Sequence, residues 1–433
     1  MERVSTIIIG GGQAGLAMSA CLSARGISHA VLERKRIAER WRSERWDSLR
    51  LLTPNWMNRL PGWSHEGGDP DGFMAATGVA AMLENYASRI SAPVHAGTNV
   101  LSLERSGDGY RAATNNGAWQ APTVVIATGY SDTPHVPGIA RCLSPAIKQV
   151  HASHYKNPGA LPEGRVLVVG ASASGLQIAH ELALSGRDVT LAVGRHIRMP
   201  RRYCGRDIMW WLETSGILNE RHSEVPDIER ARQQPSLQLS GRHETMDLAS
   251  AMRIGVHLCG RLIAMDGSRA RFGADLPQMI AASDAKLQSL LSRINRITGN
   301  RQEDWIASQP LSLSHWQPPG EVDLAAQGFS SVIWATGYQR NYNWLRIPVL
   351  DSWGELIHDG GVTPSPGLYA MGLNFMRRRK SSFIGGVGED AEELSSHLAA
   401  HLDGISFPHG RESHGRHLQF HARHNGGSHA ASA

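Results

Sequence analysis

A glycine-rich turn near the N-terminus has the spacing of a phosphate-binding loop. Gly10, Gly12 and Gly15 follow the apolar run 6–9 and precede a helical stretch, 16–25. In the pattern G-x-G-x-x-G the first glycine permits a tight turn, the second lets a pyrophosphate approach the backbone, and the third lets the helix pack closely on the strand. The helix N-terminus adds free N–H groups and a positive dipole end. The turn therefore predicts a bound dinucleotide.

An acidic residue indicates which dinucleotide this first turn holds. The expected strand 30–32 ends in Glu33, about twenty residues beyond the glycines, where a carboxylate accepts hydrogen bonds from ribose hydroxyls. A phosphate on that ribose would be repelled by Glu33. The first site therefore favours FAD.

The pattern recurs in the middle of the chain with a different charge. Gly170 and Gly175 follow the apolar run 165–169, but the next expected strand, 189–193, leads to Arg195 instead of an acid. An arginine there offers a bidentate partner to a 2′-phosphate. The second site therefore favours NADPH, with NADH possible, although Arg195 could also be an ordinary surface arginine.

Two apolar strands end in the same tetrapeptide, Ala-Thr-Gly-Tyr, at 127–130 and at 335–338. Ligands of doubly wound sheets bind beyond the carboxyl ends of the strands, so both endings are candidate site segments. The second one follows the second glycine motif, and we interpret it as the return of the chain to the first domain.

The length of 433 residues exceeds what one hydrophobic core usually holds. We expect an α/β protein with two Rossmann-like dinucleotide-binding domains, in which an NADPH domain is inserted into an FAD domain. The expected bounds are 1–160 for the first part of the FAD domain, 161–320 for the NADPH domain, 321–406 for the second part of the FAD domain, and 407–433 for a flexible His-rich tail.

Periodicity places the other elements. Helical spacing predicts helices over 77–90, 284–297 and 391–402, and alternation with a hairpin turn at 115–117 predicts an antiparallel meander over 94–122. The helix over 284–297 carries one apolar face, which we assign to the core or to an oligomer contact.

Composition excludes several classes of function. The net charge of +5 is spread along the chain without a nucleic-acid motif, and an anionic cofactor explains it. The four cysteines form no C-x-x-C pair, so neither a dithiol redox centre nor a disulfide framework is expected. We find no signal peptide, no membrane-spanning run and no catalytic metal site, and we expect a cytoplasmic monomer or homodimer. Trp and Arg interleave near Trp41 and Arg42, which we assign to cofactor or core packing and not to base stacking.

Taken together, these motifs resemble the class B flavoprotein monooxygenases, namely flavin-containing monooxygenases, Baeyer-Villiger enzymes and indole-pyruvate monooxygenases. The likeness covers roughly 4–405 and rests on both glycine motifs, Arg40-Trp41-Arg42, both Ala-Thr-Gly-Tyr ends, and 379–390. One family signature, F-x-G-x-x-x-H-x-x-x-(F/Y/W), matches only in its second half. His151 and Tyr155 are present, but Pro145 and Ile147 replace its Phe and Gly. His151 could equally be a structural linker histidine.

The resemblance implies that NADPH reduces FAD, and that a C4a-(hydro)peroxyflavin then oxygenates a small molecule with O2 as co-substrate. N- or S-oxygenation is slightly favoured over Baeyer-Villiger or keto-acid chemistry. The alternatives are a flavin-dependent NADPH oxidase or reductase and a non-catalytic flavin-binding protein. Asn55 and Arg379 are the candidate catalytic residues, although Asn55 could cap a turn and Arg379 could bind phosphate. The expected cofactor contacts are Gly10, Gly12, Gln13, Ala14, Gly15, Glu33, Arg34, Trp41, Arg42, Thr53, Thr128, Gly129, His151, Tyr155, Gly170, Ser172, Ser174, Gly175, Arg195, Thr336, Gly337, Gly372, Gly386 and Asp390.

Overall fold

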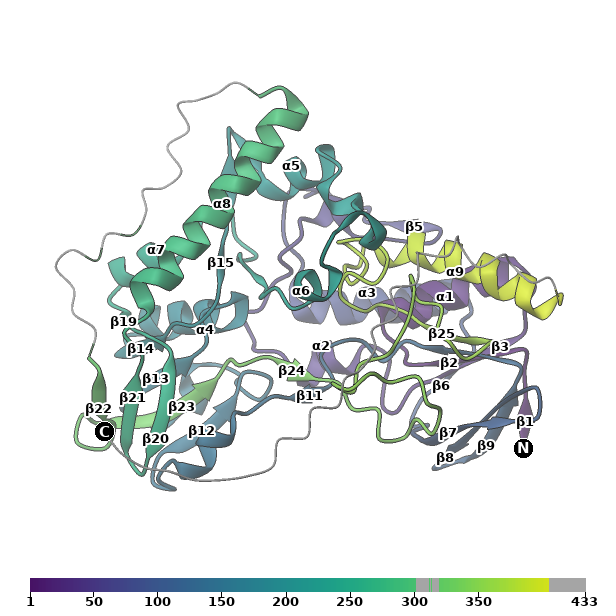
Figure 1. Ribbon diagram of the computed structural model, residues 1–433, viewed down its shortest axis with the longest axis horizontal. Helices are drawn as coiled ribbons and strands as arrows, with labels where there is room; N and C mark the ends of the chain where they lie inside the picture. The colour runs from purple at the N-terminus through teal and green to yellow at the C-terminus, as the bar shows by residue number, and fades with distance from the viewer. Residues whose placement is uncertain (301–310, 312, 314–318, 405–433) are drawn as a thin grey trace, which may run out of the picture.

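A computed structural model describes residues 1–300, 311, 313 and 319–404. Two parallel sheets lie side by side, each with helices packed on it (Figure 1). Residues from both halves line one cavity. The expected α/β fold with parallel sheets is confirmed. The predicted tail, 407–433, lies outside the described residues.

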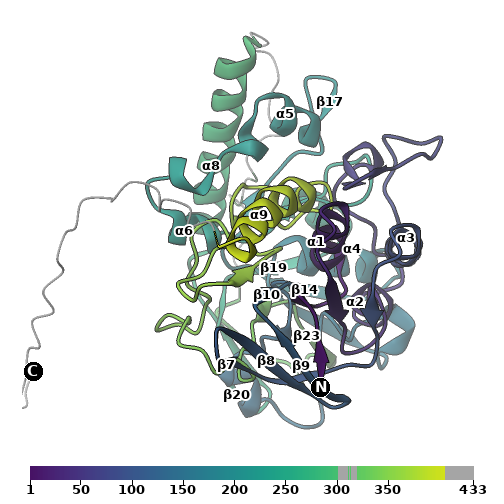
Figure 2. The same ribbon diagram turned by 90° about the vertical axis from the view of Figure 1, so that its right-hand side faces the viewer.

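The first sheet has five parallel strands in the order β25-β10-β2-β3-β6. Its central strands are buried along their whole length, as the continuous apolar runs predict for a sheet that is covered on both faces. Helix α1 follows β2 and packs against α9 near the other end of the chain (Figure 2). The bounds are β2 Thr6–Ile9, β3 His29–Leu32, β6 Val94–His95, β10 Thr123–Ile126, β25 Leu368–Ala370, α1 Gln13–Ala24 and α9 Val387–Leu402.

The second sheet has the same parallel arrangement, in the order β12-β23-β13-β14-β19. Helix α4 connects β13 to β14, as α1 connects β2 to β3, and α7 packs against α4. The bounds are β12 Lys148–His151, β13 Arg165–Val169, β14 Val189–Ala192, β19 His257–Cys259, β23 Phe329–Trp334, α4 Ala173–Leu184 and α7 Leu248–Arg253.

The second Ala-Thr-Gly-Tyr segment corrects one expectation. It does not mark a return to the first domain, because β23 pairs with β12 and β13 in the second sheet. The tetrapeptide recurs because each glycine turn packs against the strand end beside it: Gly10 against Ala127, and Gly170 against Ala335. The chain rejoins the first sheet at β25. By pairing, 148–151 and 329–334 belong with the second sheet, although they lie outside 161–320.

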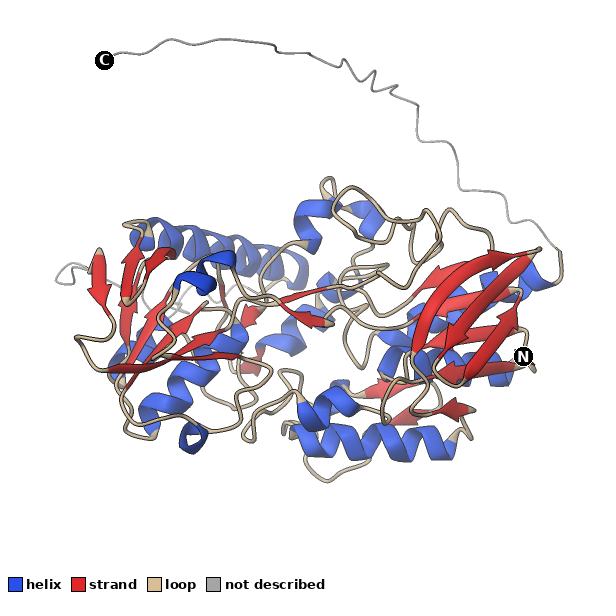
Figure 3. Ribbon diagram, turned by 90° about the horizontal axis from the view of Figure 1, so that it is seen from below, coloured by secondary structure: helices blue, strands red, loops and turns tan. Residues whose placement is uncertain are grey.

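The predicted meander is present as β7, β8 and β9, to which the N-terminal β1 adds a parallel edge (Figure 3). A second small antiparallel sheet, β20-β21-β22, adjoins the second parallel sheet. The bounds are β1 Glu2–Arg3, β7 Val100–Ser106, β8 Gly109–Thr114, β9 Gly117–Ala121, β20 Leu262–Asp266, β21 Arg269–Phe272 and β22 Glu321–Asp323.

The longest described helix, α8, contains the predicted amphipathic stretch. Leu287, Leu291 and Ile294 are buried against α5, Leu290 is half-buried, and Ile297 is exposed, so the apolar face is mainly core. The remaining helices are α2 Glu39–Ser43, α3 Ala76–Arg89, α5 Ile208–Thr214, α6 Ile228–Arg232 and α8 Leu276–Thr298, with 3-10 turns at Asn55–Met57, Gly138–Cys142, Pro158–Ala160, Ile217–Asn219 and His222–Glu224. Short strands complete the fold: β4 Arg59–Leu60, β5 Trp63–Ser64, β11 Thr133–Pro134, β15 Ile197–Arg198, β16 Arg202–Tyr203, β17 Arg206–Asp207, β18 Leu237–Gln238 and β24 Tyr338–Gln339. Within the described ranges, no helix has both the length and the apolar composition that crossing a bilayer requires.

Two contacts connect segments that are far apart in the sequence. The strands β11 and β24 pair as an antiparallel ribbon where the chain passes between the two sheets. Elsewhere, the buried Arg201 is bound by Asp207, donates to the carbonyls of Leu52 and Ser240 at 2.8 and 3.2 Å, and lies over the ring of Phe73. The guanidinium therefore joins the segments around Leu52, Phe73 and Ser240.

The third glycine of the second motif should be required for folding. A Cβ at Gly175 would lie 1.8 Å from the carbonyl oxygen of Gly170, which is backbone and cannot move away. We expect Gly175→Ala to lower the free energy of unfolding by about 1–3 kcal/mol, the usual cost of overpacking, which a urea titration would measure. Gly138→Ala is the control, because a Cβ at Gly138 meets nothing within 4 Å. Equal stability of the two variants would contradict the close approach.

Candidate functional site

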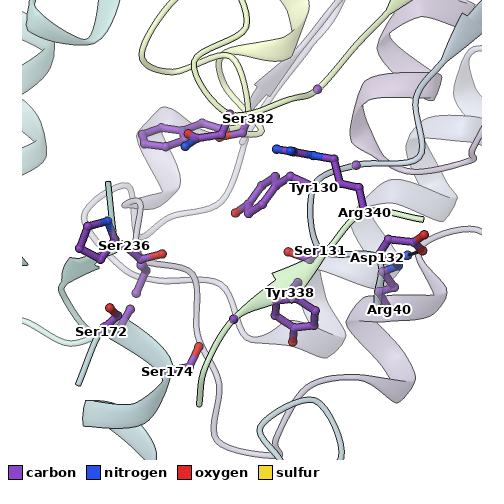
Figure 4. A pocket seen from close by; sticks show the side chains of 18 of the residues that line it. Arg40, Tyr130, Ser131, Asp132, Ser172, Ser174, Ser236, Tyr338, Arg340 and Ser382 are labelled. Atoms are coloured by element: carbon purple, nitrogen blue, oxygen red, sulfur yellow. Dashed lines mark hydrogen bonds and ion pairs between the residues drawn. The ribbon is translucent and has the colours of Figure 1, made fainter. Parts of the chain in front are cut away.

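A cavity of about 1830 Å³ lies between the carboxyl ends of the two sheets. Both glycine turns and both Ala-Thr-Gly-Tyr segments line it, together with the segment 372–384 (Figure 4). Pockets for one small ligand usually measure roughly 300–1,000 Å³. The cavity therefore has room for more than one ligand.

The three glycines of the first turn have different physical roles. Gly10 has a φ of +115°, and a Cβ there would lie 2.5 Å from the Ala127 carbonyl oxygen. A Cβ on Gly15 would lie 1.9 Å from the Gly10 carbonyl oxygen. A Cβ on Gly12 meets no protein atom within 4 Å and would extend into the cavity. Close backbone contacts therefore require glycine at positions 10 and 15, whereas Gly12 leaves open space that fits a pyrophosphate.

The start of α1 and the end of β3 complete this part of the wall. The N-cap Gly12 supplies no side-chain hydrogen bond, so the first N–H groups of the helix are available to an anion. Glu33 lines the cavity and accepts from the backbone N–H groups of Gly11 and Lys35 at 2.7 and 2.9 Å. These two bonds fix its carboxylate beside the turn, where the sequence predicted a ribose partner.

The second turn repeats this geometry. Gly170 has a φ of +106°, and a Cβ there would lie 2.4 Å from the Ala335 carbonyl oxygen. Ser172 stands at the position of Gly12 as the N-cap of α4 and forms no capping hydrogen bond. The side chains of Ser172 and Ser174 both lie on the cavity wall (Figure 4).

Arg195 differs from the arginines that follow it. It is exposed, lines the cavity beyond β14, and has no hydrogen bond or ion pair with any described residue. The neighbouring guanidinium groups have protein partners: Arg198 pairs with Asp247 and Asp284, Arg201 with Asp207, and Arg202 with the Gly205 carbonyl. Arg195 is therefore the arginine of this group that remains available to a phosphate.

His151 lines the cavity but also has a structural task. Its Nε2–H donates to the Gly337 carbonyl at 3.0 Å, and its Nδ1 accepts from the Ser153 backbone N–H at 3.1 Å. Burial lowers the pKa of His151, which favours this neutral form. The ring packs edge-on against Tyr338. His151 therefore holds the second Ala-Thr-Gly-Tyr segment, whereas Tyr155 lies off the cavity wall and donates to Glu181 at 2.8 Å.

Of the two candidate catalytic residues, one lies on the cavity wall and the other lies behind it. Arg379 lines the cavity, donates from Nε to Glu220, and has its guanidinium 4.6 Å from the centre of the Phe375 ring. Asn55 is buried behind the wall, where its Nδ2 donates to the Asp69 carbonyl at 2.9 Å. The geometry brings Arg379 to the cavity and assigns Asn55 to the support of a turn.

The other expected contacts divide in the same way. On the cavity wall lie Gln13, Ala14, Arg34, Trp41, Thr53, Thr128, Gly129, Thr336, Gly337 and Gly372. Off the wall lie Gly15, Arg42, Gly175, Gly386 and Asp390. Close packing or ion pairs explain these positions: Arg42 pairs with Glu84, Asp390 pairs with Arg378 at 2.6 Å, and a Cβ at Gly386 would lie 1.8 Å from the Lys380 carbonyl oxygen. The segment 382–384, just before α9, faces the cavity in place of the helix N-terminus.

Sequence reasoning missed charged residues that follow the two repeated strand ends. Asp132 comes two residues after the first segment and pairs with Arg34 and Arg40, and Arg340 comes two residues after the second (Figure 4). Their distance from the repeated tetrapeptide was the available signal, since side chains just beyond strand ends face the ligand in such sheets. Among the described residues, no group of His, Cys, Asp and Glu could hold a metal ion.

Comparison with known proteins assigns the family. Residues 7–213 match the family model for pyridine nucleotide-disulphide oxidoreductases. An uncharacterized CzcO-like oxidoreductase of Geobacillus kaustophilus is 36% identical over 405 residues, which cover 92% of this chain and 99% of that protein. The chain belongs to the CzcO-like oxidoreductases.

The chain also has more distant relatives. A probable indole-3-pyruvate monooxygenase of Arabidopsis thaliana, YUCCA1, is 35% identical over 205 residues, which cover 46% of this chain and 49% of that protein. A flavin-containing monooxygenase from Stenotrophomonas maltophilia matches the structure with a TM-score of 0.67 at 20% identity, covering 93% of this chain and 100% of the other. The last likeness shows the fold alone. The resemblance of the chain to class B flavoprotein monooxygenases is confirmed, and the chain is an FAD-dependent oxidoreductase.

The open space at Gly12 can be tested by filling it. We expect Gly12→Val to fold normally but to purify without flavin, because the added side chain occupies the space above the helix N-terminus. Circular dichroism would measure folding, and the ratio of flavin to protein absorbance would measure occupancy. Gly68→Val, where a Cβ also meets nothing within 4 Å, is the control outside the cavity. Full flavin occupancy in Gly12→Val would show that another loop binds FAD.

Because Arg195 has no partner among the described residues, we can test whether it binds the 2′-phosphate of the cofactor. We expect Arg195→Ala to weaken NADP⁺ binding by roughly ten- to a hundred-fold while NAD⁺ binding stays nearly unchanged, since a charge-assisted phosphate contact is lost. Titration of the dinucleotides onto the FAD-loaded protein would measure both dissociation constants. Arg202→Ala is the matched control. Equal loss for both dinucleotides would contradict a contact with the 2′-phosphate.

Proposed function

We propose that this protein is an NADPH-dependent FAD monooxygenase, which transfers one oxygen atom of O2 to nitrogen or sulfur of a small organic molecule. The observation that carries the proposal is that one cavity joins two glycine turns whose adjacent strands lead to opposite charges, Glu33 and Arg195. The acid suits an unphosphorylated ribose, and the base suits a 2′-phosphate. Two different dinucleotides are therefore expected to share the cavity.

The two sheets would form two Rossmann-like dinucleotide-binding units. In this proposal the sheet of β2 holds FAD through Gly12, Glu33 and the N-terminus of α1. The sheet of β13 holds NADPH through Ser172, Ser174 and Arg195. Bound FAD supplies hydride acceptance and reaction with oxygen, while the protein orients both cofactors and excludes water. Segment 372–384 would close the flavin side of the cavity.

The state of the cysteines supports oxygen as the electron acceptor. All four cysteines are free thiols, and Cys21 and Cys259 are buried. Burial raises the pKa of each of these two thiols to about 12, so neither is a reactive thiolate near neutral pH. With no cysteine pair in C-x-x-C spacing, the reduced flavin would pass its electrons to O2.

One observation favours a second candidate, a flavin-dependent NADPH oxidase or reductase. Pro145 and Ile147 replace the Phe and Gly of the monooxygenase signature ahead of His151. Baeyer-Villiger or keto-acid oxygenation would need the same cofactors and differs in the substrate.

The fate of the electrons from NADPH separates these functions. We expect the FAD-loaded protein, supplied with NADPH and isotopically labelled O2, to place the label in a product of a panel of thioethers, amines and ketones, because the cofactors bound in the cavity would shield the reaction from water. Mass spectrometry would detect the label, and peroxide assays would measure uncoupled turnover. The control is the same reaction without substrate, which should yield hydrogen peroxide. Peroxide equal to NADPH consumed with every substrate would favour the oxidase.

A further inference from the structure

One positively charged side chain on the cavity wall has no direct ion pair among the described residues. Arg232, the last residue of α6, is half-buried and lines the cavity. Its Nε donates to the Phe375 carbonyl at 3.3 Å, and within the described ranges no carboxylate lies at ion-pairing distance from its guanidinium. Burial lowers the pKa of Arg232 and the charge of Arg340 adds to this effect, whereas the carboxylates of Glu229, Asp359 and Glu355, which lie beyond ion-pairing distance, oppose it.

Arg201, which is buried and has a structural role, has different partners from Arg232. Burial lowers the pKa of Arg201 as well, but both carboxylate oxygens of Asp207 accept from it at 2.7 Å. The backbone carbonyls of Leu52 and Ser240 accept from its Nη1. Since desolvated charges in proteins are normally paired, Arg232 is the exception that faces a cavity.

The position of Arg232 is fixed by a strained turn. Phe375 has a φ of +46°, a conformation that costs a non-glycine residue about 1–3 kcal/mol and is concentrated at functional sites. This turn directs the Phe375 carbonyl to Arg232, while the Asn374 side chain donates to the Arg232 carbonyl at 2.9 Å. Helix α6 is thereby tied to the segment 372–384 on the cavity wall.

A second cation lies on the same wall. Arg340 pairs with Glu355 through one terminal nitrogen, while its Nε is buried without a partner among the described residues. Figure 4 shows the side chains of Arg340 and Tyr130 directed into the same space. Arg340 is therefore paired with a carboxylate, whereas Arg232 has no ion pair among the described residues.

We propose that Arg232, supported by Arg340, binds the anionic group of the substrate, and that the substrate is an apolar organic acid. The proposal rests on the proposed function, since the ligand is the molecule to be oxygenated. A planar guanidinium suits a carboxylate, and the loss of water from Arg232 is offset only when an anion binds. Apolar side chains elsewhere on the cavity wall, Leu218, Leu290 and Phe383, suit the body of such a molecule.

The phosphate groups of the cofactors are the other source of anionic oxygens. The glycine turns and Arg195 offer partners for these phosphates. If Arg232 bound a cofactor phosphate instead, its removal would weaken FAD or NADP⁺ and leave the substrate preference intact. The experiment therefore measures all three ligands.

The test uses two thioethers that differ in charge, 4-(methylthio)benzoate and its methyl ester. Binding to the FAD-loaded protein saturated with NADP⁺ is followed by the change in flavin absorbance, which needs no turnover. We expect the benzoate to bind at least ten-fold more tightly than the ester, because only the benzoate forms a charge-assisted bond. Arg232→Met should abolish this preference, and Arg232→Lys should retain part of it.

The controls separate the possible causes of a loss. Arg89→Met removes an exposed arginine that is also the last residue of a helix, α3, but lies off the cavity wall, and it should leave the preference unchanged. Flavin content and the NADP⁺ dissociation constant should stay within about two-fold of the parent in both Arg232 variants. No benzoate preference in the parent protein, a preference that survives in Arg232→Met, or a loss confined to FAD or NADP⁺ would each overturn the proposal. Selective benzoate binding without an oxygenated product would contradict the proposed function but support the subsite.

Discussion

The close approach of a glycine turn to the neighbouring strand end determines how this molecule presents its cavity. In each parallel sheet, a glycine with positive φ lies where a Cβ would contact a carbonyl oxygen, Gly10 against Ala127 and Gly170 against Ala335. Any side chain would separate the strands at the edge where ligands bind. Because the contact is between backbones, it sets the position of the turn whatever the surrounding side chains are. The same steric constraint therefore positions both glycine turns of the site.

The chemical difference between the copies resides in side chains that this constraint does not affect. Gly12 and Ser172 occupy equivalent N-cap positions, yet one leaves open space and the other presents a hydroxyl. Glu33 is held by two backbone N–H groups, whereas Arg195 is exposed and has no described partner. In the function we propose, the residues that follow the second strands would distinguish the two dinucleotides on one scaffold.

Local patterns in the sequence predicted the parts of the fold that local physics determines. The glycine spacing, the apolar runs of β2 and β13, the meander and the amphipathic α8 all appeared in the structure. The assignment of 335–338 to the first domain failed, because both sheets end a strand with the same tetrapeptide and strand pairing is a long-range property. The position of Asn55 was also not evident from the sequence: its polar side chain in an aromatic segment suggested a site, and in the structure its Nδ2 donates to the Asp69 carbonyl behind the cavity wall.

The buried arginines were the hardest residues to predict, because their role depends on whether a carboxylate pairs with them in the folded chain. Nothing in the sequence around Arg232 separates it from Arg230 in the same short helix, and both would be taken for surface charges. Only the folded chain shows that one is half-buried against the Phe375 carbonyl without a carboxylate, while the other is exposed. Arg201 was equally inconspicuous in sequence, yet Asp207 neutralises it and it joins the segments around Leu52 and Ser240. Since burial of a charge is costly in both places, the presence or absence of a counter-charge distinguishes an arginine that stabilises the fold from one that is available to a ligand.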